Sequence, residues 1–123
     1  GPSLHVMHSA LPHHPYQYAA TGERYAGGAA AEGLAADGVW VAHPELVTTA
    51  RRQYLQQVAL ADRLLGELVA QLRSVGLYDR TLLIVTADHG VSVEPGQPQR
   101  TLLESNYMDI AAVPMFVKRP GQT

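Results

Sequence analysis

Cysteine is absent from this sequence of 123 residues, and so are long hydrophobic runs and a large excess of charge. Without cysteine the chain has neither a disulfide framework nor a thiolate metal site. No apolar run approaches the roughly 18 residues of a membrane-spanning helix, and the first residues lack the basic and apolar regions of a targeting signal. The formal net charge of −2 gives no positive electrostatic field that would attract a polyanion. This argues against nucleic acid as a partner.

What the sequence does contain is typical of one folded domain. Hydrophobic residues make up 46% of the chain and charged residues 16%, a balance that favours a globular protein over a disordered one. We divide it into residues 3–18 (a strand and a His/Pro loop), 19–43 (an excursion rich in Ala and Gly), 44–90 (a helix and a strand) and 91–123 (a loop and a strand).

The region 44–90 carries the clearest pattern. Apolar residues recur every three or four positions, which predicts a helix of about eight turns with one stripe in the core. Pro44 suits its first turn and Gly76 its end. The stripe consists of Leu46, Val47, Ala50, Tyr54, Val58, Ala61, Leu65, Leu68, Val69 and Leu72. The next apolar or β-branched run, residues 82–86, predicts a strand buried on both faces, as in a parallel sheet, so the pair indicates an α/β architecture.

The N-terminal region predicts less regular structure. Residues 4–10 alternate loosely and suggest a short strand. In the segment Leu11-Pro12-His13-His14-Pro15-Tyr16, two prolines exclude a helix interior or a central strand, so we expect a stiff, extended loop that fixes the direction of the imidazoles. Residues 19–38 include the glycine pair at 27 and 28 and predict a surface excursion with little regular structure.

Three shorter segments complete the expected elements. Residues 39–41, Val-Trp-Val, form an apolar plug that would pin the excursion to the core. Residues 106–110 predict a helical turn, and residues 113–118 predict a second strand with Pro114 near its start, where a missing donor is tolerated.

A candidate metal site lies at the end of the first predicted strand. Asp88 and His89 stand where this strand would run out, and ligand sites in open α/β sheets lie at the carboxyl ends of strands. Gly90 would let the chain turn there. Oxygen and imidazole ligands suit zinc or manganese more than calcium. The alternative is a hydrogen-bonded cap of the turn, and two ligands are fewer than the three of a catalytic zinc site.

Three segments resemble, in order, motifs of the sulfatase and alkaline phosphatase superfamily. Residues 11–16 are similar to its Pro-His-x-Pro loop, residues 76–90 to the helix-to-strand segment ending in Asp-His-Gly, and residues 113–121 to its Val-Pro strand ending in Lys-x-Pro-Gly. The resemblance implies an α/β chain, part of an alkaline-phosphatase-like layered fold with a mainly parallel central sheet flanked by helices.

The resemblance also implies roles for individual residues. Asp88 and His89 match the pair that binds one or more divalent metal ions, with calcium also possible. His13 matches the histidine that contacts the anionic group of a sulfate or phosphate ester. His14 is a second candidate for that contact, its alternative role being a hydrogen-bond partner. Arg100 lies in no family motif and is included only as a cation that could face the anion.

The branch of the superfamily stays open. His89 favours the phosphatases and phosphotransferases, because sulfatases more often place Asn after the Asp, with calcium. The proline loop and the Val-Pro strand favour the sulfatases. We therefore expect a hydrolase of sulfate esters, or alternatively a phosphotransferase or phosphatase acting on phosphate esters of lipid or glycan headgroups.

The family's nucleophile has no counterpart in this sequence. There is no Cys, and residues 9–13 do not fit the family's Cys/Ser-x-Pro-x-Arg motif. We therefore expect residues 1–123 to be an internal or carboxyl-side part of one sulfatase-like domain, inactive and weak in metal binding by itself. The resemblance implies an extracytoplasmic parent, with membrane attachment only through a segment absent here. A second hypothesis is a non-catalytic piece that forms a homo-oligomer through open sheet edges.

Overall fold

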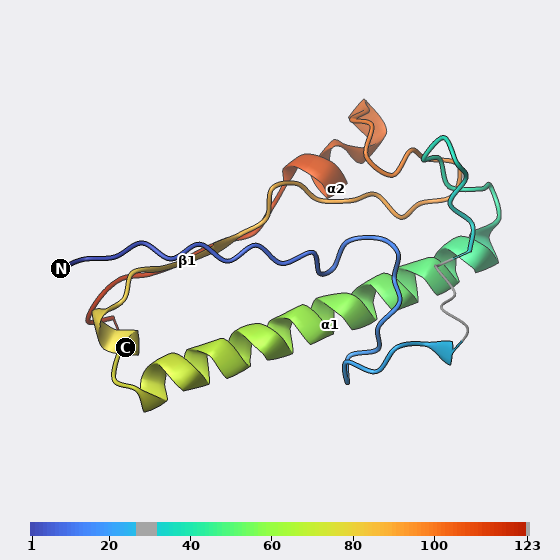
Figure 1. Ribbon diagram of the computed structural model, residues 1–123. Helices are drawn as coiled ribbons and strands as arrows, with labels where there is room; N and C mark the ends of the chain where they lie inside the picture. Colours follow the sequence, from blue (N-terminus) through green and yellow to red (C-terminus); the bar gives the residue numbers. More distant parts are fainter. Residues whose placement is uncertain (27–31, 123) are drawn as a thin grey trace.

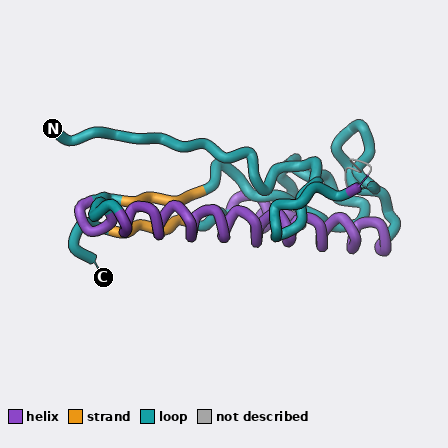
Figure 2. Tube along the Cα trace, turned by 60° about the horizontal axis from the view of Figure 1, so that its bottom comes forward, coloured by secondary structure: helices purple, strands orange, loops and turns teal. Residues whose placement is uncertain are grey.

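One long helix and a two-stranded sheet organise the structure, a computed structural model that describes residues 1–26 and 32–122. The elements are α1 (Pro44–Ser74), the 3-10 helix η2 (Tyr78–Arg80), β1 (Leu83–Thr86), the 3-10 helix η3 (Glu104–Asn106), α2 (Tyr107–Ala111) and β2 (Met115–Lys118). Figure 1 shows α1 running along most of the molecule, with the strands and α2 on one side of it and the blue-to-cyan segment before residue 27 crossing to the other side. Figure 2 shows the two strands beside the carboxyl-terminal half of this helix.

Both ends of α1 lie where the sequence predicts them. Pro44 occupies the first turn, where its missing N–H costs nothing. At the other end Gly76 adopts a φ of 69°, its N–H donates to the carbonyl of Arg73 (3.1 Å), and the N–H of Leu77 donates to that of Leu72 (2.9 Å). This pair of bonds is a Schellman motif, which favours glycine at the left-handed position.

The apolar stripe of α1 is buried only in part. Val47 and Ala50 of the stripe are buried, and so is Leu60, which lies outside it, but Val58 of the stripe is 37% exposed. Gln57, outside the stripe, is 1% exposed. The prediction of a fully buried stripe is therefore wrong, because the described residues cover mainly the amino-terminal half of the helix, and they cover it with a polar loop as well as with apolar side chains.

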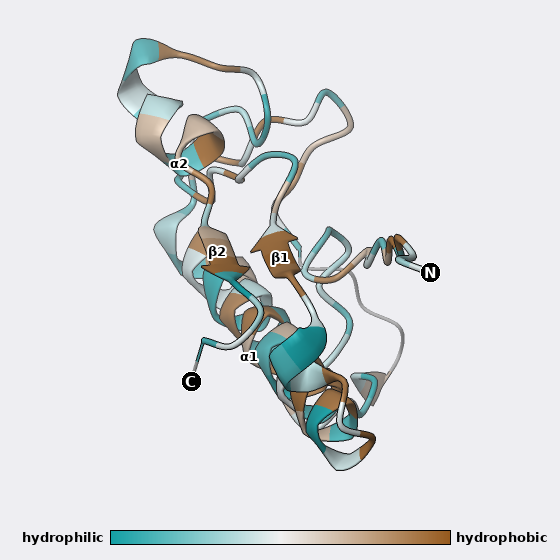
Figure 3. Ribbon diagram, turned by 90° about the vertical axis from the view of Figure 1, so that its left-hand side faces the viewer, coloured by the Kyte–Doolittle hydropathy of each residue, from teal (hydrophilic) through white to brown (hydrophobic). Residues whose placement is uncertain are grey.

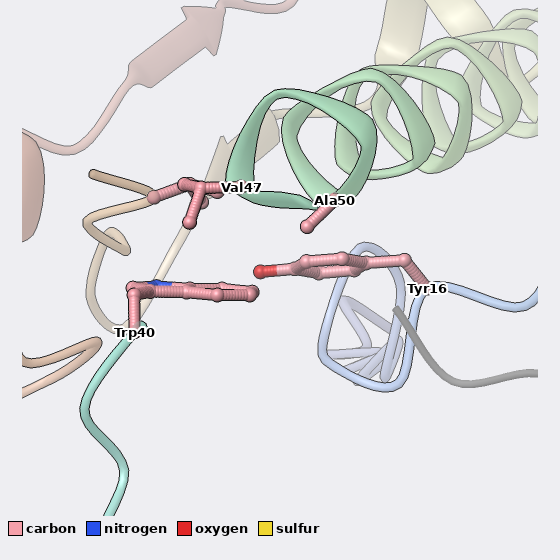
Figure 4. Close-up of a cluster of buried hydrophobic side chains, with 5 residues drawn as sticks. Tyr16, Trp40, Val47 and Ala50 are labelled. Atoms are coloured by element: carbon pink, nitrogen blue, oxygen red, sulfur yellow. The ribbon is translucent and has the colours of Figure 1, made fainter. Parts of the chain in front are cut away.

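The core lies against the first turns of α1. It consists of Tyr16, Trp40, Val47, Ala50 and Val93. Figure 4 shows the rings of Tyr16 and Trp40 side by side below the helix. The indole N–H of Trp40 donates to the carbonyl of Ser92 (2.8 Å), so this ring is both packed and hydrogen-bonded. The predicted plug at residues 39–41 is confirmed by this burial.

The two strands pair antiparallel. Leu83 is opposite Lys118 and Thr86 is opposite Met115. Within the described residues this is the whole sheet, so the mainly parallel central sheet expected from the resemblance is not confirmed. The reason is the path of residues 87–114, which turn back through α2 and return the chain beside β1 in the opposite direction (Figure 1).

The prediction that β1 is buried on both faces is wrong for this chain. Its residues alternate between half-buried and exposed, and Ile84 is 51% exposed. Figure 3 shows that both strands are nevertheless strongly hydrophobic. A two-stranded sheet has no neighbouring strand or second layer to cover its outer face, so the apolar composition of β1 exceeds what its surroundings bury.

The remaining expectations have mixed outcomes. The prediction of a strand at residues 4–10 is wrong, because this stretch is exposed and forms no strand pairing with any described segment. The helical turn predicted at residues 106–110 is confirmed as α2, and the second strand begins two residues later than predicted. Of the excursion, residues 27–31 lie outside the described residues. No described helix is both long and apolar enough to cross a bilayer.

Candidate functional site

Asp88 and His89 follow the end of β1 and hold each other in place. The N–H of His89 donates to Asp88 Oδ1 (3.0 Å). His89 Nδ1 lies 2.7 Å from the carbonyl oxygen of Gly90. A carbonyl only accepts, so Nδ1 carries the proton of this bond and the neutral ring presents the lone pair of Nε2. This nitrogen lies 3.8 Å from Asp88 Oδ2.

The local electrostatics favour the ionised form of Asp88. The hydrogen bond from the N–H of His89 is the main cause that lowers the pKa of this carboxyl, and smaller electrostatic contributions from His89 and His8 lower it further. His8 therefore lies within electrostatic range of Asp88. A metal ligand must be deprotonated, and both side chains are open to solvent.

The pair fits a metal ion as two ligands of a larger set. Metal bonds of about 2.1 Å place tetrahedral ligands about 3.4 Å apart, close to the 3.8 Å between His89 Nε2 and Asp88 Oδ2. In the described part of the chain no three His, Asp or Glu side chains are grouped to hold a metal. A divalent ion there would supply charge to polarise an ester oxygen. The predicted half-site therefore has suitable geometry, without its further ligands.

Gly90 is required by a close approach of two backbones rather than by a turn. Its N–H donates to the carbonyl of Ile110 (2.8 Å). A Cβ on Gly90 would lie 2.0 Å from the carbonyl oxygen of Asp109. Its φ is not positive, so the expectation that this glycine lets the chain turn is wrong. It lets α2 dock against the residue that follows His89.

Replacing Gly90 with alanine is expected to lower the free energy of unfolding by about 1–3 kcal/mol, because the new methyl group forces backbones apart. Urea denaturation of this chain measures the change. Gly66 is the matched control, since a Cβ there meets nothing within 4 Å and alanine should stabilise the helix by about 0.5–1 kcal/mol. Equal effects of the two substitutions would contradict the close approach.

The loop that carries His13 and His14 is bent. Both of its prolines follow cis peptide bonds, and the N–H of His13 donates to the carbonyl of Ala10 (2.8 Å). The expected stiffness of the loop stays a prediction, whereas the prediction of an extended loop is wrong. The reason is the local hydrogen bond, which closes a turn that the sequence pattern did not reveal.

The two histidines of the loop differ in environment. The ring of His13 is exposed, and its Nδ1 hydrogen-bonds the carbonyl of His14. The ring of His14 is half-buried and packs edge-on against Tyr16, with 5.3 Å between centroids and 81° between planes. His13 is thus the histidine available to solvent, whereas His14 joins the loop to the core.

A hollow of about 550 Å³ lies between this loop and α1, and both histidines line it. Arg63 of α1 lines it as well. The guanidinium donates to the carbonyl of Thr21 (3.1 Å) and pairs with Glu67 at 2.7 Å. Sequence reasoning missed Arg63, because an (i, i+4) pair with Glu67 is typical of an exposed helix surface. The hollow is the place where the structure combines imidazole and cationic groups.

Arg100 lies near the base of the same loop. Its neighbour Gln99 donates from Nε2 to the hydroxyl of Tyr16 (3.4 Å). Burial raises the pKa of Tyr16 to about 12. The charge of Arg100 lowers this pKa, so Arg100 lies within electrostatic range of Tyr16. The structure thus brings Arg100 towards the histidine loop, whereas neither Asp88 nor His89 lines the hollow.

A second hollow of about 420 Å³ lies beside α2. Its lining is Leu102, Leu103, Glu104, Tyr107 and Met108. The lining is mainly apolar, with one carboxylate and the hydroxyl of Tyr107, and it contains no cationic or imidazole group for a sulfate or phosphate anion, so we do not assign this hollow to the candidate site.

A long helix, a strand followed by Asp-His-Gly and a preceding histidine loop are the features in which this chain resembles the alkaline-phosphatase-like hydrolases. The model of the sulfatase family matches residues 1–123, and the chain belongs to that family. It is 35% identical over 72 residues to arylsulfatase K of Bos taurus, a match that covers 58% of this chain. It also resembles the solved structure of the phosphonate monoester hydrolase SpPMH of Silicibacter pomeroyi, with a TM-score of 0.56 and 31% identity over 63% of this chain.

The chain spans a small part of both relatives. The matches cover 13% of the arylsulfatase and 15% of the phosphonate hydrolase.

Proposed function

We propose that this chain is part of a metal-dependent sulfatase-like hydrolase that acts on sulfate esters. Asp88 and His89 are two ligands of its divalent metal, with zinc or manganese favoured, and His13 contacts the anionic group of the ester. The nucleophile and the remaining ligands come from the rest of the enzyme, so the 123-residue chain alone is inactive.

The arrangement of the Asp88–His89 pair carries this proposal. The hydrogen bond to the Gly90 carbonyl leaves His89 Nε2 as an acceptor 3.8 Å from the Asp88 carboxylate. The hydrogen bond from the N–H of His89 lowers the pKa of Asp88, which favours the ionised form that a metal ligand requires. A hydrogen-bonded turn cap needs neither a free Nε2 nor an exposed carboxylate oxygen, whereas a metal site needs both.

Hydrolysis or transfer of phosphate-type esters is the second candidate. The likeness to a phosphonate monoester hydrolase supports it, as does a histidine rather than an asparagine after Asp88. Sulfate and phosphate monoesters present similar anionic oxygens, so the same pair and the same histidine loop serve either. We also propose that the whole enzyme is extracytoplasmic and membrane-anchored, as the resemblance implies. The formation of a homo-oligomer through open sheet edges stays a prediction.

The test uses the full-length enzyme with 4-nitrophenyl sulfate, 4-nitrophenyl phosphate and a phenyl phosphonate monoester. We expect turnover of the sulfate ester to be fastest, to disappear after EDTA treatment and to return with Mn²⁺ or Zn²⁺. Faster turnover of the phosphate or phosphonate ester would favour the second candidate. Turnover that survives complete metal removal would contradict both.

A further inference from the structure

We infer that Gln57 of α1 positions the loop that carries His13 and His14, and the catalytic consequence of this inference rests on the proposed function. Gln57 is 1% exposed. Its Nε2 donates to the carbonyl of His13 (3.1 Å), and its Oε1 accepts from the N–H groups of Gln17 (2.8 Å) and Tyr18 (3.2 Å). One buried amide therefore binds the loop at His13, in its middle, and the chain just after it at Gln17 and Tyr18.

The loop depends on this amide because it has little regular structure of its own. Residues 11–16 form neither helix nor strand, and its two prolines have no N–H to donate. The turn bond from His13 to Ala10 closes the loop locally, but it does not fix the loop relative to α1. The hydrogen bond from Gln57 to the His13 carbonyl fixes the loop relative to α1. It does so at the residue whose imidazole is exposed.

Tyr16 supplies a second attachment to the same helix. Its ring is 1% exposed, lies next to Ala50 (Figure 4), and is 5.5 Å from the ring of Tyr54. The segment from His13 to Pro15 thus runs between two points that are both anchored on α1. Side chains held by a rigid helix keep their geometry better than side chains on a free loop.

The choice of glutamine at position 57 is informative. A methionine would fill a similar volume in the buried position, but it would leave the His13 carbonyl and the two N–H groups without this partner. Buried backbone groups are costly when unpaired, so an apolar residue would let the loop shift to find other partners. If position 57 served only to fill the core, an apolar side chain would do so without an amide group.

The experiment compares Gln57→Met, Gln57→Glu and the control Gln71→Met in the full-length enzyme. Gln71 is an exposed residue of the same helix, and Glu keeps the acceptor towards Gln17 and Tyr18 while losing the donor towards His13. The measurements are kcat/KM for 4-nitrophenyl sulfate, the inhibition constant of inorganic sulfate, the melting temperature, and the imidazole NMR signals of ¹⁵N-labelled histidine.

For Gln57→Met we expect kcat/KM to fall about 10–100-fold, since small misplacements of a contact group have effects of this size. The inhibition constant of sulfate should rise, and the His13 signals should shift while those of His89 stay in place. Gln57→Glu should shift the same His13 signals, and it serves as the test if Gln57→Met does not fold. Gln71→Met should change none of them.

Unchanged His13 signals and unchanged kcat/KM in Gln57→Met would overturn the inference, even with a lowered melting temperature, because a purely structural glutamine predicts that result. If the wild-type enzyme hydrolyses none of the three esters, the proposed function fails. The His13 signals then decide by themselves whether Gln57 positions the loop, so the two failures are distinguishable.

Discussion

Replacing Asp88 with asparagine in the full-length enzyme is expected to lower kcat/KM by about 10²–10⁴-fold, and His89→Ala should have an effect of similar size. A catalytic metal supplies several kcal/mol of transition-state stabilisation, and each 1.36 kcal/mol is about tenfold in rate. Asn keeps an oxygen that accepts the N–H of His89, but it removes the charge that attracts the cation. Steady-state kinetics and metal content by mass spectrometry measure both consequences.

Two substitutions provide matched controls. Asp37→Asn makes the same chemical change at a carboxylate that also accepts a backbone N–H, that of Val39 (3.0 Å). His43→Ala removes an exposed imidazole that makes no capping hydrogen bond to α1. Both controls should retain the activity and the metal content of the wild type. Full activity of Asp88→Asn or His89→Ala would refute the assignment of these residues as metal ligands.

Trp40→Ala is expected to lower the free energy of unfolding by about 3–5 kcal/mol, as large-to-small changes at buried tryptophan do. The ring is 1% exposed and is the largest member of a core of five residues. Its loss leaves a cavity between α1 and the segment around Val93, and removes the hydrogen bond to Ser92. Urea denaturation of the 123-residue chain measures the change.

Trp40→Phe separates packing from hydrogen bonding. Phenylalanine keeps most of the apolar contact but leaves the carbonyl of the buried Ser92 without the indole N–H, which should cost about 1–3 kcal/mol. Tyr107→Ala removes an aromatic side chain that is 53% exposed and should change stability by less than about 0.5 kcal/mol. An equal loss for Trp40→Ala and Tyr107→Ala would contradict the proposed core.

The elements whose signals are local were predictable from the sequence. The helix from Pro44 to Ser74 follows from apolar periodicity, a proline at its start and Gly76 after its end, all of which act within a few residues. The position of Asp88 and His89 was predictable in the same way, because the two residues are neighbours in the chain and lie just after a strand.

The relations between distant segments were not predictable in this way. The antiparallel pairing of β1 with β2 and the exposure of Ile84 depend on where the chain returns after residue 90. The burial of Gln57 depends on a loop about 40 residues earlier in the chain. Gln57 lies three residues after Tyr54 and four before Ala61, on the face of the stripe, but its polar side chain predicts an exposed residue, and only the carbonyl and N–H groups of that loop account for its burial.

The sequence by itself determined the long helix, the hydrophobic strand and the adjacent Asp88–His89 pair, because periodicity, end signals and chain neighbours act locally. Only the tertiary structure decided that Gly90 accommodates the backbone of α2, that His13 rather than His14 is exposed, and that Gln57 and Arg63 of one helix meet the histidine loop. These properties arise from packing and hydrogen bonds between segments far apart in the chain, whose partners no local pattern specifies.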